Sequence, residues 1–134
     1  MTDLSDDRGL VSVQSAYPFS ETVQRLLDAF AHHGLKVFAT IDQAAEAEAV
    51  GLTMPPTTLI IFGNARAGTP LMLAQPRSGI DLPLKALVTA PAVGGQVTVS
   101  LNKSDYIISR HSLPKGLQRN LAPAENLVVT AVTK

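Results

Sequence analysis

The residue types best suited to binding a ligand gather in one segment, residues 62–72. Gly68 allows backbone conformations that other residues rarely adopt, and Thr69 opens a short expected helix whose first amides would point outward. A helix N-terminus carries partial positive charge and favours an anion such as a carboxylate or phosphate. Arg66 would add a full charge and Asn64 a side-chain amide. The alternative is an ordinary turn with an Asn or Thr cap, since the Gly-Lys-Ser/Thr ending of a phosphate-binding loop does not occur.

Asp81 is the second residue that could do chemistry, because it stands between apolar neighbours in the run Ile80-Asp81-Leu82. A carboxylate buried there needs backbone donors or arginine partners. To serve as a catalytic acid or base it would also need a nearby cleft. The alternative is an aspartate that only caps a loop.

Other catalytic and metal-binding patterns do not occur in the sequence. It contains no cysteine, which excludes disulfides, thiolate metal sites and cysteine nucleophiles. The three histidines, His32, His33 and His111, are not spaced as metal ligands. Serine-nucleophile and dinucleotide motifs do not occur either. We therefore expect the protein to bind no metal and no cofactor. The sequence does not identify catalytic residues, and it favours a role other than catalysis.

Length and composition predict a single domain, residues 1–134, with residues 1–8 as a flexible N-terminus. Hydrophobic residues make up 46% of the chain and charged residues 16%, which argues against extensive disorder. The polar start is unlike a signal peptide, and no apolar stretch approaches the ~20 residues that span a bilayer. With the absence of cysteine, this favours a soluble protein of the reducing cytoplasm.

Charge is unevenly distributed along the chain. Residues 1–65 hold eight acidic and three Lys or Arg residues, whereas residues 66–134 hold three acidic and eight Lys or Arg residues. The fold can mix the two halves on one surface, or the halves can complement each other across a dimer, or a basic face can attract an anion. Basic residues are scattered and aromatic residues make up only 4%, so we do not expect nucleic-acid binding.

Hydrophobic periodicity predicts the order βαβαβ, then a short helix, a β-hairpin and another helix. The expected elements are strands at 9–16, 35–41, 57–62, 82–90 and 96–101, and helices from Ser20 to Gly34, at 43–50, at 69–74 and at 104–110, with a hairpin turn at Gly94-Gly95. The strand at 57–62 is apolar on both faces, so it is covered on both sides, or covered once and buried in a dimer. The end of the chain, from Glu125, fits helix or strand. The fold class is α+β, a two-layer sandwich with a mixed or antiparallel sheet and helices mainly on one face.

Several of these segments, taken in order, resemble a bacterial family known as domain of unknown function 302. The matching motifs are Ser20-Glu21-Thr22-Val23, the run from Gly34 to Asp42, Ala47 to Leu52, Leu59 to Asn64, Gly68-Thr69-Pro70-Leu71-Met72, Ile80 to Lys85, and Asn102 to His111. The resemblance covers roughly residues 10–112. It implies a sandwich of the TATA-binding-protein-like class and a homodimer, and it implies no established activity.

The favoured hypothesis is a small-ligand-binding or accessory domain that binds an anion at the 63–72 loop. Its candidate site residues are Asn64, Arg66, Gly68, Thr69 and Asp81. One alternative is a dimeric scaffold or interaction protein. The other is an enzyme that uses Asp81 as acid or base while the polar residues of the loop position the substrate. The expected partners are a second copy of the chain and a small anionic ligand, and neither nucleic acid nor a membrane.

Overall fold

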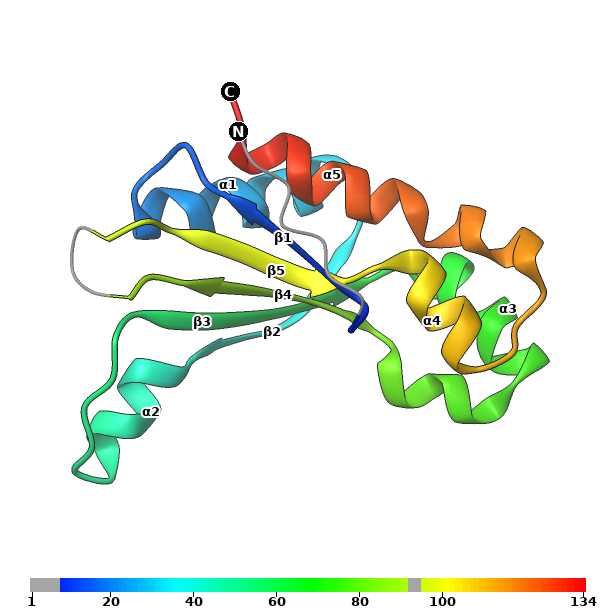
Figure 1. Ribbon diagram of the computed structural model, residues 1–134, viewed down its shortest axis with the longest axis horizontal. Helices are drawn as coiled ribbons and strands as arrows, with labels where there is room; N and C mark the ends of the chain where they lie inside the picture. Colours follow the sequence, from blue (N-terminus) through cyan, green and yellow to red (C-terminus); the bar gives the residue numbers. More distant parts are fainter. Residues whose placement is uncertain (1–7, 92–94) are drawn as a thin grey trace.

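The computed structural model describes residues 8–91 and 95–134. They form a five-stranded sheet in the order β1-β5-β4-β3-β2, in which every neighbouring pair is antiparallel (Figure 1). The elements are β1 (Leu10–Gln14), α1 (Phe19–His32), β2 (Lys36–Asp42), α2 (Gln43–Ala49), β3 (Thr57–Gly63), α3 (Ala65–Ala74), the 3-10 helix η1 (Pro76–Asp81), β4 (Leu84–Thr89), β5 (Thr98–Asn102), α4 (Ser104–Arg110), the 3-10 helix η2 (Lys115–Asn120) and α5 (Ala122–Val132). The predicted α+β sandwich is confirmed.

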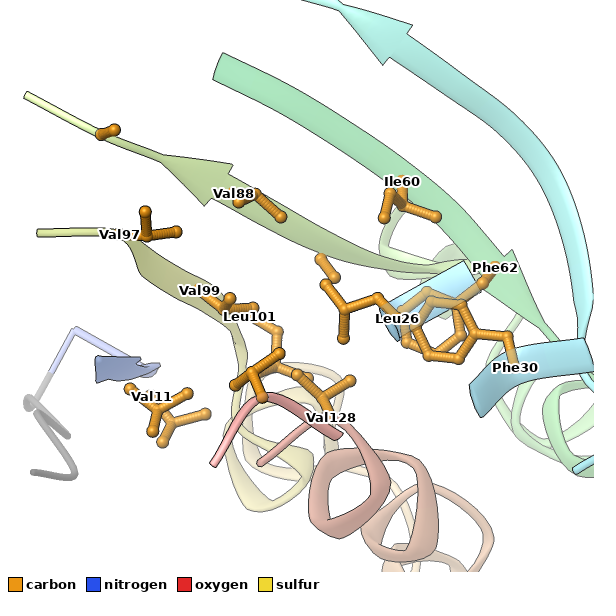
Figure 2. Packing of buried hydrophobic residues seen from close by; sticks show 14 residues of the cluster. Val11, Leu26, Phe30, Ile60, Phe62, Val88, Val97, Val99, Leu101 and Val128 are labelled. Atoms are coloured by element: carbon orange, nitrogen blue, oxygen red, sulfur yellow. The ribbon is translucent and has the colours of Figure 1, made fainter. Parts of the chain in front are cut away.

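One face of the sheet is buried beneath α1 and α5, which lie next to each other across it (Figure 1). Because side chains alternate along a strand, every second residue points to this face. In β3 these residues are Ile60 and Phe62, and α1 meets them with Leu26 and Phe30, which lie four residues apart on one side of the helix. The same core contains Val11, Val13, Ala86, Val88, Val99, Leu101, Val128 and Val132 (Figure 2).

The tightest contact in this core joins α1 to the central strand. The rings of Phe30 and Phe62 stack with their centroids 3.9 Å apart and their planes 11° from parallel. Both side chains are fully buried (Figure 2). This stack fixes the end of β3 that leads directly into α3.

The opposite face of the sheet carries an apolar row that is partly exposed. Ile41 of β2 faces Leu59 of β3, which in turn faces Leu87 of β4. The row becomes polar at Ser100 and Ser12, whose hydroxyl oxygens lie 2.7 Å apart. The two apolar faces predicted for residues 57–62 are therefore one covered face and one open face.

Three helices end in the same hydrogen-bonded motif. After α1, α2 and α4, the next-but-one residue takes a left-handed conformation, and the amide that follows it bonds back to a carbonyl in the last turn of the helix. The left-handed residues are Gly34 (φ 72°), Gly51 (φ 82°) and Ser112 (φ 51°). The predicted glycine stops of the first two helices are confirmed, whereas α4 ends on a serine.

Two expected boundaries differ from the structure, and one choice that the sequence left open, helix or strand at the end of the chain, is decided by it. Ser20 is not the N-cap of α1, because the helix begins at Phe19 after Pro18. The helix expected at 69–74 begins at Ala65, since Asn64 caps it, and so Thr69 lies inside α3. The end of the chain is the helix α5, which buries Val128 and Val132.

Two predictions fall partly outside the described residues. The strands on either side of the expected hairpin turn pair as antiparallel neighbours, but Gly94 itself is not described. Of the predicted flexible segment 1–8, only Arg8 is described. Within residues 8–91 and 95–134, none of the helices is both long and apolar enough to cross a bilayer.

The stack between α1 and β3 gives the first testable expectation. Phe62→Ala should lower the free energy of unfolding by about 3–5 kcal/mol, because it opens a cavity in the centre of the core. Phe38→Ala is the matched control, since Phe38 is 49% exposed and should cost less than about 1 kcal/mol. Urea unfolding followed by circular dichroism measures both. Equal losses in the two variants would contradict the core assignment.

Candidate functional site

An apolar pocket lies beyond the end of β3, where α3, the segment that leads into β4, η2 and the start of α5 meet the sheet. Its volume is about 340 Å³. The apolar walls come from Leu35, Phe38, Met72, Leu82, Pro83, Leu84, Leu121 and Ala124. Small concave sites of this kind bind ligands mainly through apolar contact, with a few polar groups setting orientation.

Two glycines, Gly63 and Gly68, line this pocket. A Cβ at Gly63 would stand 3.4 Å from the Cβ of Pro83, and a Cβ at Gly68 would stand 3.9 Å from Leu82 Cδ1. Both of these neighbours line the pocket. A larger side chain at Gly68 would therefore occupy space that a ligand could fill.

The polar groups of the pocket come from Asn64, Thr69 and Asn120. Asn64 Oδ1 accepts a hydrogen bond from the Arg66 amide (2.9 Å), and Asn64 O accepts from the amides of Ala67 and Gly68. Asn120 Nδ2 donates to Ala67 O (3.1 Å) and so ties η2 to α3. The amides expected to receive an anion near Thr69 thus lie within the helix, because it starts four residues earlier than expected.

A second hollow adjoins the pocket and carries the positive charge. Its volume is about 470 Å³, and it shares lining residues with the pocket, among them Asn64 and Asn120. Arg66 and Arg119 line it, together with His33. Both arginines are exposed. An anionic group could lie in this hollow while an apolar body reaches the pocket.

Asp81 lies at the end of η1 and lines neither of these hollows. Its side chain is 8% exposed. Arg110 Nη1 donates to both carboxylate oxygens at 3.0 Å, and His111 Nε2 donates to Oδ2 at 2.6 Å. We expected a buried Asp81 to need backbone donors or an arginine partner, and Arg110 is that partner.

The chemistry of this cluster is that of an anchor. Both carboxylate oxygens of Asp81 already accept hydrogen bonds, and the His111 side chain is only 9% exposed. A general acid or base must reach the substrate proton directly or through one water. The geometry favours a carboxylate that holds α4 against η1 over one that transfers protons. In the described part of the chain, no three His, Asp or Glu side chains converge as metal ligands do.

The residues predicted to form one site therefore lie in separate places in the structure. Asn64, Gly68 and Thr69 line one pocket, Arg66 lines the hollow beside it, and Asp81 lies apart from both. Their part in ligand binding stays a prediction.

Sequence reasoning did not assign the apolar walls, Asn120 or Arg119 to the site. These residues reach it from β2, the segment between η1 and β4, β4, η2 and α5, and only the tertiary fold shows that they meet. The sequence predicted that a buried Asp81 would need a partner such as an arginine, but it did not identify Arg110 as that arginine.

Comparisons with known proteins identify relatives of most of the chain. A protein of Brucella suis biovar 1 (strain 1330), named fluoride-specific ion channel FluC 1, is 40% identical over 116 residues, which cover 87% of this chain and 44% of that protein. A protein of the same name from Brucella abortus biovar 1 (strain 9-941) is 40% identical over 116 residues and matched over 42% of its length. The chain thus spans less than half the length of these relatives.

A solved structure shares the fold. The crystal structure of an uncharacterized conserved DUF302 protein from Bacillus stearothermophilus aligns with a TM-score of 0.76 over 92% of this chain and 95% of that chain. The two sequences are 17% identical, so this likeness concerns the fold alone. The family model described as Domain of unknown function DUF302 matches residues 11–129, most of the chain. The chain belongs to this family, DUF302.

Proposed function

We propose that the chain binds a small amphipathic anion, a carboxylate on a short apolar body, and that it acts as an accessory domain rather than as an enzyme. The observation that carries this proposal is the joining of two hollows of different character. The pocket beside Gly68 is apolar, and the hollow beside it is lined by Arg66 and Arg119. Asn64 and Asn120 line both and mark the boundary between them.

The apolar body supplies most of the binding energy in this arrangement. Burying one CH₂ group contributes about 0.8 kcal/mol, whereas an exposed ion pair contributes about 0–1 kcal/mol. Arg66 and Arg119 are exposed. Their role is to select an anionic head and to orient it, so ligand specificity depends on them more than affinity does.

The relatives support the accessory part of the proposal. In two Brucella proteins named fluoride-specific ion channels, the matched region makes up 44% and 42% of the protein. More than half of each protein lies outside the match. We infer that the matched region serves the rest of such a protein, or a separate partner, by binding a small molecule. A cytoplasmic location is also proposed, because a chain without cysteine suits a reducing compartment.

A second candidate function, a dimeric scaffold, rests on a different observation. Leu59 and Leu87 form part of an apolar row on the open face of the sheet. Nearby in sequence, Val50 and Leu52 after α2 are 74% and 64% exposed. Contiguous exposed apolar surface is typical of interaction sites. A second copy of the chain would cover the row, as the central apolar strand leads us to expect.

Ligand binding is tested with three compounds that share one apolar body: hexanoate, hexanol and hexylamine. Hexanoate should bind best, hexanol several-fold more weakly, and hexylamine weakest, because the arginines favour the anion. Arg66→Gln combined with Arg119→Gln should remove the preference for hexanoate and leave hexanol binding unchanged. Isothermal titration calorimetry measures these affinities. Equal binding of all three compounds to the unaltered protein would contradict the role of the arginines.

A matched pair of variants at Gly68 tests where the apolar body binds. Gly68→Leu should abolish binding of hexanoate and hexanol, because its side chain fills the pocket. Gly68→Ala is the control: it should keep most of the binding and raise the free energy of unfolding by about 0.5–1 kcal/mol, since alanine is the better helix former. Unimpaired hexanoate binding by a folded Gly68→Leu protein would remove this pocket as the site.

Dimerisation is tested by light scattering across a dilution series. The unaltered chain should have the mass of two copies at micromolar concentration, and Leu87→Lys should have the mass of one while its circular dichroism is retained. Thr40→Lys is the control, because Thr40 is exposed and faces Ile60 on the helix-covered side of the sheet. A monomeric mass for the unaltered chain at every concentration would reject the scaffold.

A further inference from the structure

A third hollow, of about 750 Å³, lies between η1 and the end of α4. Its lining includes the cationic or cation-forming side chains Arg77, Arg110 and His111, along with Gln75 and Ser112, and it includes no carboxylate. It shares no lining residue with the pocket or hollow of the proposed function. Asp81 lies behind it, with its side chain 8% exposed.

The bond between Asp81 and Arg110 orients the guanidinium in this hollow. Arg110 uses Nη1 for both bonds to Asp81, and its side chain is 47% exposed. Among the described residues, Arg110 Nε and Nη2 donate to no other protein group. A guanidinium presents its donors in a fixed plane, so holding one nitrogen also fixes the direction of the others. These remaining donors suit a planar or tetrahedral oxyanion.

Ser112 gives a second and independent indication. It occupies the left-handed position that closes α4, and the same position after α1 and α2 is glycine. A left-handed conformation disfavours any side chain that has a Cβ. The serine therefore makes the end of this helix less stable than glycine would, and it adds a hydroxyl at the edge of the cationic hollow. Residues held in such conformations cluster at functional sites.

We infer that this hollow binds a phosphate-type oxyanion, with Arg77 and Arg110 as charged donors and the Ser112 hydroxyl as a neutral donor. The several oxygens of such an anion can accept from donors that reach it from η1 and from α4 at once. A monatomic anion such as fluoride or chloride cannot bridge donors spread over a hollow of this size. The site is distinct from the amphipathic-anion site and does not depend on it.

The test measures the binding of inorganic phosphate by calorimetry and by the rise in melting temperature, with potassium chloride at matched ionic strength as the baseline. Phosphate should bind the unaltered protein, and sodium fluoride should have no more effect than the chloride baseline. Arg77→Gln should weaken phosphate binding at least tenfold. Lys115→Gln, an exposed change three residues after Ser112 that does not line the hollow, should leave phosphate binding unchanged.

Ser112→Gly separates the ligand role from a structural one. It should raise the melting temperature of the free protein, because glycine suits the left-handed position, and it should weaken phosphate binding about fivefold. A folded Ser112→Gly or Arg77→Gln protein that binds phosphate as the unaltered protein does would overturn the inference. An effect of phosphate no larger than that of chloride, or binding of fluoride in preference to phosphate, would overturn it as well.

Discussion

The carboxylate of Asp81 constrains the whole end of the molecule where the ligand-binding features lie. It joins η1 to the end of α4 through Arg110 and His111, which follow it by 29 and 30 residues in the sequence. A buried carboxylate is stable only when its oxygens are paired, so the two segments must stay together. Leu82 and Leu84, one and three residues after Asp81, line the apolar pocket, while Arg110 and His111 line the third hollow. The cluster of Asp81, Arg110 and His111 thus lies between the apolar pocket and the third hollow and holds the segments that line them.

The sheet explains why these surfaces occur at its end. Its covered face is filled by α1 and α5, and the stacked rings of Phe30 and Phe62 leave no room for a ligand there. Beyond Phe62 the chain turns into α3, and the short elements that gather around it form a second, smaller core with Leu71 and Ile107. The pocket lies where these short elements meet the end of the sheet, and Gly63 and Gly68, which carry no side chain, are among the residues that line it.

Much of the fold could be read from the sequence because it depends on local patterns. Alternating apolar residues predicted the strands, and the stops at Gly34 and Gly51 depend on the left-handed conformation that glycine favours. The predicted start of α3 was wrong because the sequence left two possible caps, Asn64 and Thr69. Asn64 is the cap, so the helix starts four residues earlier than expected and its free amides lie away from Thr69.

The site was only partly predictable. Asn64, Gly68 and Thr69 lie near each other in sequence and line one pocket, whereas Arg119 and Asn120 reach it through η2, whose position depends on tertiary packing. Asp81, the fifth candidate residue, does not line the pocket with them, because its carboxylate is paired with Arg110 of α4. A crystal structure of the protein grown with hexanoate would examine the proposed site most directly. We expect the alkyl chain between Phe38 and Leu84, with its carboxylate near Arg66 and Arg119. Hexanoate bound elsewhere, or a pocket that stays empty at saturating hexanoate, would contradict the proposed function.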